Sequence, residues 1–362
     1  MRYCINKTSS STSIVVSIIT PTFNSAKYIK ETIDSVISQT FESWEMILVD
    51  DGSSDNTILI IDVYRKIYPQ IKYYSRHRGP KSASTCRNIG AVHAIGKYLL
   101  FLDSDDILLP NCLKRRVEIM NHHAGLPFAV FPTATFVKSH NKVSLTCLNK
   151  AKENYFYEFI SSSAPWQTSG PIWKRDFFFE IGGFDESYQR LQDVEFTTKA
   201  LLKAGNQYYI YNGKDYDYLY RISYRKREQE FIKMLQLSYS LYYEWVKTLE
   251  KKVENKRKYE ISRLSLLIAQ SYSEFMYPDK EGIKRLISNL GKSIGSDFSR
   301  FDYWIFKFST YKIGYYPIYV WRAYLIAKYH QRIHDLPNQY FIIWITTKLI
   351  SRYRKNNPWK KI

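Results

Sequence analysis

The sequence predicts an α/β fold with a doubly wound, mainly parallel sheet, followed by a helical C-terminal region. Three observations predict it. Short runs rich in Val, Ile and Leu alternate with helical patterns in the first half of the chain, as expected when helices connect parallel strands. Polar residues directly follow several of these runs. Beyond about Tyr220 the pattern becomes helical, with few glycines and many tyrosines.

The elements of the first half follow from periodicity and from turn residues. Strands are expected at the apolar or β-branched runs 14–20, 45–49, 71–75 and 98–102. Helices are expected where apolar residues recur on one face, over 26–39, 58–67 and 83–95. Pro21 is expected to end the first strand, because proline has no N–H to donate to a neighbouring strand.

Charge divides the chain into a nearly balanced part and a basic part. A length of 362 residues suits one large domain with an appendage. Residues 1–220 hold 25 Lys and Arg against 22 Asp and Glu, whereas 221–362 hold 28 against 12. We therefore expect a frayed lead-in over 1–13, a main domain over 14–220 and a basic, aromatic-rich helical region over 221–362. The main domain is expected to divide into halves of about 14–110 and about 111–220.

Cysteine use and hydropathy indicate the compartment. The four cysteines form no C-x-x-C pair and have no metal-like spacing, which favours a reduced, intracellular set without disulfides. The N-terminus lacks the pattern of a signal peptide, and no stretch offers the ~20 mostly apolar residues of a membrane-spanning helix. These features predict a cytoplasmic protein.

Polar residues follow the predicted strands where each strand ends. Thr20 and Pro21 end the first strand, Asp50 and Asp51 end the second, and an acidic run beginning at Asp103 ends the last. In an open α/β sheet, ligands bind beyond the carboxyl ends of the strands. We therefore expect these residues to converge on one crevice.

The acidic run Asp103, Asp105 and Asp106 predicts a metal site. Three carboxylates in four residues repel one another unless a cation neutralises them, and Mg²⁺ or Mn²⁺ bound together with substrate phosphates fits oxygen ligands. The alternative is a solvated turn or a helix N-cap, for which Asp106 is well placed.

The crevice is also expected to bind a nucleotide. Asp50 or Asp51 can accept hydrogen bonds from a base or ribose, and Gly52 lets the chain turn after them. Lys81 and Arg87 can offset diphosphate charge near a helix that starts at about Ser82. A solvated basic loop is an equal alternative for the arginines at 76 and 78.

Six short segments complete the pattern. In chain order they read S-I-I-T-P-T-F-N, S-Q-T-F-E-S-W-E-M-I-L-V-D-D-G-S-S-D-N-T, C-R-N-I-G, L-D-S-D-D, G-G-F-D-E and L-Q-D-V-E-F. This ordered set resembles glycosyltransferase family 2, of the bacterial surface-polysaccharide type, over about residues 14–211. The resemblance implies the GT-A fold, in which a Rossmann-like nucleotide-binding half is merged with an acceptor-binding half.

The resemblance also implies roles for individual residues. Thr20 and Asp51 match uridine-contacting positions, Asp105 matches a metal ligand with Asp103 at the other end of the D-x-D, and Asp193 matches the catalytic base. The family usually has an acidic residue before that base, whereas this chain has Gln192, so the environment of the base is less acidic. The implied donor is a UDP-sugar, hexosyl or N-acetylhexosaminyl, used with Mn²⁺ or Mg²⁺.

The expected reaction is one direct displacement with inversion. A positioned carboxylate takes the proton of the acceptor hydroxyl as that hydroxyl attacks, while cationic groups stabilise the departing diphosphate. A helix N-cap is the structural alternative for Asp193. Trp166 and Trp173 precede the base and are candidates for an acceptor platform, with core packing as the alternative for both. The acceptor is expected to be a glycan or a lipid-linked sugar.

The basic region 221–362 has three interpretations. It interleaves 28 aromatic with 28 basic residues, which suits anionic lipid headgroups, with interfacial helices at 315–329 and 339–353. Single-stranded nucleic acid is a rival partner, but no nucleic-acid motif accompanies the pattern, so this partner is not expected. A helical domain that only packs on the catalytic one is the third. The first interpretation predicts peripheral attachment to the inner face of the cell membrane.

Two other functions compete with glycosyl transfer. A nucleotidyltransferase also uses a doubly wound sheet and acidic metal ligands, but it wants a glycine-rich basic loop after the first strand, which T-P-T-F-N-S-A does not supply. A non-catalytic glycan- or lipid-binding protein with a decayed site is the other. The joint retention of Asp51, Asp103, Asp105 and Asp193 argues against decay.

Overall fold

The structure is a computed structural model with two compact units, Met1–Tyr242 and Tyr243–Ile362. The residues that it describes are 13–136, 144–146 (backbone only), 155–162, 164–213, 215–222, 229–256, 259, 263 and 266. The domain boundary that charge predicts near Tyr220 lies inside the first unit.

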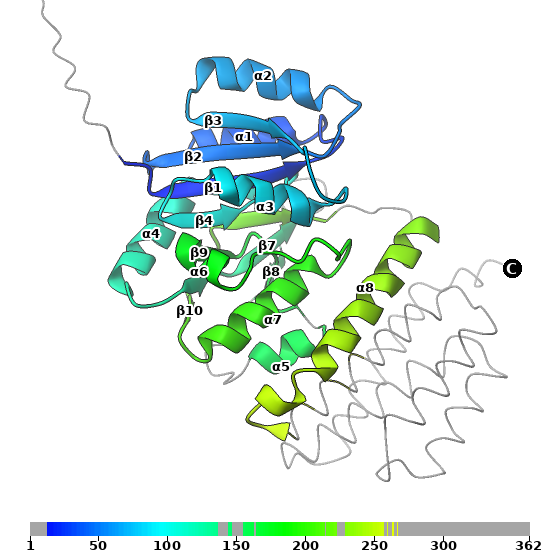
Figure 1. The fold of residues 1–362 in the computed structure, drawn as a ribbon. Coiled ribbons are helices and arrows are strands. Elements are labelled where there is room, and N and C mark those ends of the chain that lie inside the picture. Colours follow the sequence, from blue (N-terminus) through cyan, green and yellow to red (C-terminus); the bar gives the residue numbers. More distant parts are fainter. Residues whose placement is uncertain are drawn as a thin grey trace, which may run out of the picture. The chain divides into compact units, whose positions relative to one another are not determined.

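A mainly parallel sheet forms the centre of the first unit (Figure 1). Its strand order is β10-β6-β9-β4-β1-β2-β3, and β9 is antiparallel to both its neighbours. The strands are β1 (Val16–Thr22), β2 (Trp44–Asp50), β3 (Ile71–Ser75), β4 (Tyr98–Phe101), β6 (Phe128–Val130), β9 (Pro171–Lys174) and β10 (Tyr209–Ile210). This architecture confirms the predicted fold class.

Helices join and cover these strands. They are α1 (Ile29–Ile37), α2 (Thr57–Ile67), α3 (Ala83–His93), α4 (Cys112–His122), α5 (Tyr155–Ile160), α6 (Arg175–Glu180), α7 (Gln192–Ala204) and α8 (Gln229–Lys247), with a 3-10 turn at Glu250–Lys252. The predicted elements of the first half are all present, with ends shifted by up to a few residues. As Figure 1 shows, α2 lies beyond β3 at one edge of the sheet, and α3 crosses its face.

A second, smaller sheet has the order β5-β11-β7-β8. Its strands are β5 (Ile107–Leu108), β7 (Thr133–Phe136), β8 (Ser144–Thr146) and β11 (Tyr218–Arg221). Since β11 pairs antiparallel with β5, it returns to lie beside the strand that follows the acidic run at 103–106.

Pro21 does not end the first strand as expected. β1 continues to Thr22 and keeps its register with β2. The neighbour on its other side, β4, pairs with β1 only as far as Ile19. Pro21 therefore lies where β1 has no ladder partner on one side, and its missing N–H costs no hydrogen bond.

The core explains why the sequence adopts this sheet. Ile18, Leu48 and Leu100 on adjacent strands are fully buried, as are Ile29 and Ile33 on α1. Each such side chain contributes about 1.5–3 kcal/mol by leaving water. β1, β2 and β4 are buried along their whole length, as expected for parallel strands covered on both faces.

The basic C-terminal region is described only in part. Of the expected helical region 221–362, the structure describes α8 and the 3-10 turn. Within the second unit, the Tyr259 hydroxyl donates to the Val246 carbonyl at 2.8 Å. The expected helices at 315–329 and 339–353 lie outside the described residues. Among the described residues, no helix has the length and apolar character needed to cross a bilayer.

Candidate active site

Three of the predicted site segments lie at the same edge of the sheet. The Leu102 N–H donates to the Ile19 carbonyl, and the Asp51 N–H donates to Thr22. These bonds hold the chain segments that follow β4 and β2 beside the end of β1. Thr20, Asp51 and Asp103 are thereby brought to one edge, as the parallel order predicts. The Thr20 hydroxyl is buried without a hydrogen-bond partner among the described residues.

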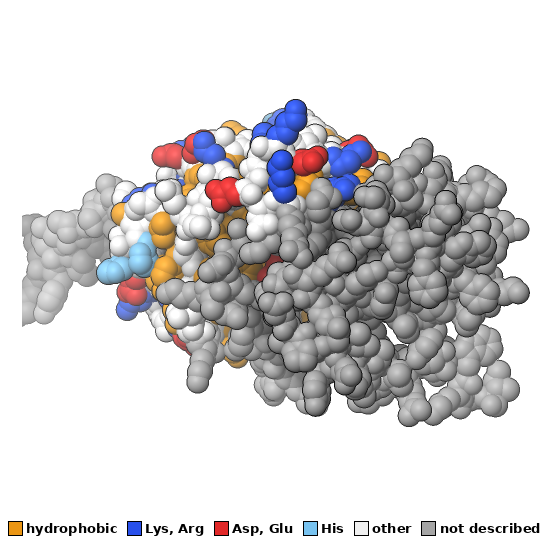
Figure 2. Space-filling model, turned by 90° about the horizontal axis from the view of Figure 1, so that it is seen from below, with side chains coloured by type: hydrophobic (Ala, Val, Ile, Leu, Met, Phe, Trp, Pro, Cys, Tyr) orange, Lys and Arg blue, Asp and Glu red, His pale blue; other side chains and the backbone are white. Residues whose placement is uncertain are grey.

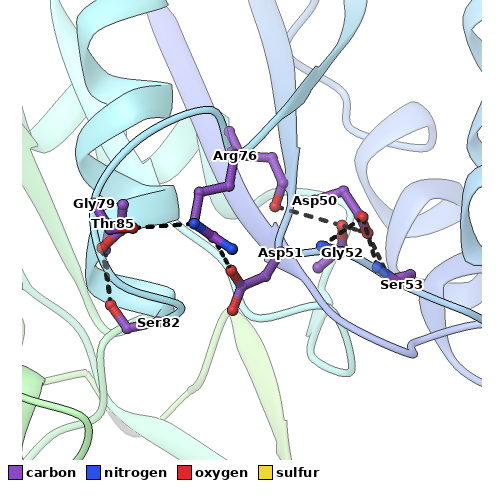
Figure 3. A network of polar contacts seen from close by, with 10 residues as sticks. Asp50, Asp51, Gly52, Ser53, Arg76, Gly79, Ser82 and Thr85 are labelled. Atoms are coloured by element: carbon purple, nitrogen blue, oxygen red, sulfur yellow. Dashed lines mark hydrogen bonds and ion pairs between the residues drawn. The ribbon is translucent and has the colours of Figure 1, made fainter.

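Asp50 supports the turn after β2. Its carboxylate accepts hydrogen bonds from the Gly52 and Ser53 N–H groups at 2.9 and 2.8 Å (Figure 3). It also accepts from the Thr22 hydroxyl at 3.1 Å. The positive φ of 87° at Gly52 favours glycine there. Because its carboxylate is buried and already hydrogen-bonded, we correct the expected nucleotide role of Asp50 to a structural one.

Asp51 lies in a basic and aromatic setting. Its Oδ1 accepts a hydrogen bond from Arg76 Nε at 2.5 Å (Figure 3). Burial raises the pKa of this carboxyl, and Arg76 and Lys81 oppose that shift. The Lys81 ammonium lies 3.6 Å from the centre of the ring of Phe23, which is 46% exposed. Among the described residues, no hydrogen bond is made to the other oxygen of Asp51, Oδ2, and Phe23 directly follows Thr22, whose carbonyl accepts the Asp51 N–H.

Arg87 links the acidic run to the segment that carries Asp193. It is buried in the first turns of α3, which Ser82 caps by accepting from the Thr85 N–H at 3.2 Å. Its guanidinium donates to Asp103 Oδ1 at 2.5 Å and to Gln192 Oε1 at 3.4 Å. The predicted helix start at Ser82 is confirmed.

The acidic run divides into outward and inward carboxylates. Asp106 is fully buried, and its oxygens accept from the Arg221 N–H at 3.1 Å and the Ser169 hydroxyl at 3.0 Å. Burial, with Asp103 and Asp105 nearby, raises its pKa well above the usual range. The Asp103 side chain is 32% exposed. Asp106 is therefore a structural group rather than a solvated helix cap.

Asp103 and Asp105 fit a divalent ion only when a second ligand completes its coordination. Among the described residues no three His, Cys, Asp or Glu side chains are arranged to hold a metal. Asp103 and Asp105 supply hard oxygen donors, and Mg²⁺-type ions are commonly held by one or two carboxylates plus substrate phosphates. The residues present fit a metal that binds with a diphosphate.

Asp193 stands in the first turn of α7. The residue before the helix, Leu191, has a left-handed backbone with φ of 58°, and Asp193 Oδ1 accepts from the Val194 N–H at 3.0 Å. Burial raises the pKa of Asp193, while Arg87 opposes the shift and Asp103 adds to it. A partly exposed carboxyl with a raised pKa suits a general base.

Tyr220 on β11 is a site residue that sequence reasoning missed. The charges of Asp103, Asp105, Asp106 and Asp193 all raise its pKa, after burial. It therefore lies near both the acidic run and the expected base. Tyr220 lies at the predicted domain boundary, where the sequence gives no reason to expect a site residue. The pairing of β11 with β5 brings it to the crevice.

Arg76 and Arg78 are paired, not simply solvated. Besides Asp51, Arg76 contacts the Gly79 carbonyl at 3.0 Å. Arg78 pairs with Glu186 at 2.9 Å, and Glu186 also accepts from Asn88 at 2.9 Å. The basic loop at 76–81 is thus tied to the G-G-F-D-E segment.

Trp166 and Trp173 belong to the core. Their side chains are 2% and 1% exposed. Trp173 packs on Phe128 and Phe196 at ring distances of 4.5 and 4.9 Å, and Trp166 packs 4.7 Å from Phe159. Because neither ring has a face free to stack on a sugar, we correct the expected acceptor platform to core packing.

Comparison with known proteins agrees with this geometry. The model of the family "Glycosyl transferase family 2" matches residues 17–173, the segment that carries Thr20, Asp51, Arg87 and Asp103. Residues 17–173 thus have the sequence pattern of a family 2 glycosyltransferase domain. The resemblance of the sequence motifs to that family is confirmed.

Two curated relatives and one solved structure are among the similar proteins. The putative teichuronic acid biosynthesis glycosyltransferase TuaG of Bacillus subtilis (strain 168) is 41% identical over 108 residues, 29% of this chain and 42% of that protein. The minor teichoic acid biosynthesis protein GgaA of the same organism is 29% identical over 232 residues, 59% of this chain and 48% of that protein. The chain thus spans less than half the length of both relatives.

The solved structure has a similar fold. The crystal structure of S. aureus TarS 1–349 in complex with UDP superposes with a TM-score of 0.58 at 19% identity, covering 96% of this chain and 93% of that one. At this identity the likeness concerns the fold, which is the predicted GT-A type.

Proposed function

We propose that this chain is an inverting glycosyltransferase that transfers a sugar from a UDP-sugar to a hydroxyl of a glycan or lipid-linked acceptor. The observation that carries the proposal is Arg87, whose guanidinium pairs with Asp103 at 2.5 Å and reaches Gln192, the neighbour of Asp193, at 3.4 Å. The buried guanidinium of Arg87 therefore contacts both Asp103, a candidate metal ligand, and the residue next to the candidate base Asp193.

The nucleotide end of the donor belongs at Asp51. A free carboxylate oxygen there can accept an N–H of a uracil or a ribose hydroxyl, and Phe23 offers a ring for stacking. Thr20 has a buried hydroxyl without a partner, which a bound nucleotide can satisfy if the loop adjusts. UDP rather than another carrier is supported by the UDP-bound structural neighbour.

The chemistry assigned to the chain is a single displacement. Asp193 accepts the proton of the acceptor hydroxyl while the hydroxyl oxygen forms a bond to the anomeric carbon, and the bond from that carbon to the diphosphate oxygen breaks. Arg87 and Lys81 offset the charge of the departing diphosphate. Mn²⁺ or Mg²⁺ held by Asp103 and Asp105 supplies further electrostatic stabilisation when bound.

A nucleotide-sugar panel tests the proposal. Wild-type protein is incubated with UDP- and GDP-sugars and Mn²⁺ or Mg²⁺, and release of the nucleoside diphosphate is measured alongside Asp105→Ala and Asp193→Asn. We expect metal-dependent turnover of one UDP-sugar that both variants lose. Absence of UDP binding by the wild type with either metal would refute the assignment.

The basic C-terminal region is proposed to attach the protein peripherally to the cytoplasmic face of the membrane, where a lipid-linked acceptor is presented. On the face in Figure 2 the described surface mixes basic and acidic side chains. The excess of 28 Lys and Arg over 12 Asp and Glu lies instead in 221–362. Flotation with anionic and with neutral liposomes at low salt tests this: a chain that floats with neither would contradict it.

A further inference from the structure

Arg221, the last residue of β11, is a buried cation behind the acidic run. Its side chain is 7% exposed. The guanidinium carbon lies 4.4 Å from the ring centre of Tyr28 and 4.4 Å from that of Phe136. A guanidinium held between two rings has its plane fixed, so its N–H groups point in set directions.

The N–H groups of Arg221 form hydrogen bonds with two parts of the molecule, the acidic run and α1. Arg221 Nε donates to the Asp105 carbonyl at 2.9 Å, and the Arg221 backbone N–H donates to Asp106 Oδ1 at 3.1 Å. One terminal nitrogen, Nη2, pairs with Glu31 Oε2 on α1 at 2.6 Å. Arg221 thus forms two hydrogen bonds with the acidic run and connects the run to α1, the helix that follows β1.

The other side of the run is held by neutral groups. The Thr32 hydroxyl donates to the Asp106 carbonyl at 2.9 Å and contacts the Ser104 carbonyl at 3.0 Å. Ser104 also shares a hydrogen bond with Ser25 at 2.7 Å. Carboxylates so close together repel one another, which favours a more open conformation of the run. Among these contacts, Arg221 supplies the charge-assisted hydrogen bonds that oppose this repulsion.

We propose that Arg221 is a positioning residue that holds the acidic run in the geometry needed to bind a metal–diphosphate complex. The inference rests on the proposed function. Arg221 contacts the main chain of Asp105 and the buried Asp106, so it acts through the run and does not touch the substrate. Without Arg221, the Asp105 carboxylate can move relative to Asp103. This movement weakens the binding of any ligand that needs both carboxylates.

The test compares UDP binding with and without Mn²⁺, by calorimetry on the full-length protein. Arg221→Met keeps much of the apolar stem and removes the fork. Arg221→Lys keeps the charge but has no planar fork to reach Asp105 and Glu31 together. Arg65→Met is the matched control, because Arg65 is about half exposed and forms its ion pair with Asp62 on the same helix, α2.

We expect Mn²⁺ to tighten UDP binding in the wild type and in Arg65→Met. In Arg221→Met, the factor by which Mn²⁺ tightens UDP binding falls at least about tenfold, while UDP binding without metal stays within about twofold of the wild type. Arg221→Lys recovers only part of the lost Mn²⁺ effect. A purely structural role would instead lower the melting temperature and weaken both kinds of binding equally.

Two outcomes overturn the inference separately. If Arg221→Met keeps the full Mn²⁺ effect, the positioning role is wrong and the proposed function stands. If the wild type binds no UDP, or binds it without any metal effect, both fail together. Should Arg221→Met not fold, Glu31→Gln decides: it leaves the bonds to the acidic run in place, and we expect about a threefold loss of the Mn²⁺ effect. An unchanged Mn²⁺ effect in that variant refutes the role.

Discussion

At the scale of single residues, Asp193 carries the clearest consequence of the proposed chemistry. Asp193→Asn keeps the size of the side chain but cannot take a proton. We expect kcat to fall about 10²- to 10⁴-fold, as for the loss of a general base, while UDP affinity changes little. Turnover and UDP binding are measured on the same preparations, and a variant that loses both would indicate a scaffold role instead.

The pH dependence of turnover follows from the same residue. Burial raises the pKa of Asp193, and the base works only when it is ionised. The rate should therefore fall on the acid side, at a higher pH than for an ordinary aspartate, and reach a plateau on the alkaline side. A kcat profile without a fall on the acid side would contradict this assignment.

Glu195, half a turn further along α7, predicts a pH-dependent stability. Burial raises its pKa from 4.5 to about 7, with Lys199 opposing. The folded protein then holds a proton that the unfolded chain has released, so the free energy of unfolding falls as pH rises from about 4.5 to 7.

Glu195→Gln removes this titration. Denaturant unfolding at pH 5 and pH 7.5 measures the difference. We expect the loss of stability between the two values to be smaller in the variant than in the wild type. Glu180→Gln is the control, because the Glu180–Lys203 pair is about half exposed and such pairs contribute little. Equal slopes in all three proteins would count against the buried proton.

At the scale of elements, Gly90 sets how closely α3 lies on β1. A Cβ added there would stand 2.5 Å from Ile19 Cγ2, a fully buried side chain of the strand. Gly90→Ala should therefore lower the free energy of unfolding by about 1–3 kcal/mol, the usual cost of overpacking. Gly125, where a Cβ would meet nothing within 4 Å, gives the matched alanine control. Urea unfolding of both variants measures it, and equal midpoints would contradict the close approach.

The sequence was most informative about elements that are periodic and locally capped. The runs at 71–75 and 98–102 and the Ser82 helix start were predicted because each signal lies within a few residues. The role of Asp50 was not predicted, since a carboxylate that caps its own turn has the same sequence as one that binds a ligand. Tyr220 and Arg221 were missed because the acidic run beside which they lie is more than a hundred residues earlier in the chain.

At the scale of the whole molecule, the first compact unit extends beyond the point at which the charge pattern changes. α8 belongs to that unit as far as Tyr242, whose hydroxyl donates to the Phe159 carbonyl at 2.9 Å and contacts Thr198 at 2.7 Å. Ser238 also accepts from the Arg190 N–H at 3.1 Å. Net charge changes near Tyr220, but packing does not.

Truncation separates the two boundaries. A chain ending at residue 256 keeps α8, whereas one ending at residue 220 loses Arg221 and the buried Tyr242. We expect the shorter chain to be less stable by at least about 3 kcal/mol, the cost of deleting one large buried side chain. Thermal and urea unfolding of both chains measure this, and equal stability would show that α8 adds nothing to the first unit.

The pairing of Arg87 with Asp103 affects the protein at rest. The pair gives the outward carboxylate of the acidic run an internal counter-ion. Under the proposed function, a nucleoside diphosphate bound near Arg87 would compete with Asp103 for this guanidinium. A divalent ion would then meet an unpaired Asp103 carboxylate only when the donor is present, so the two ligands would bind cooperatively.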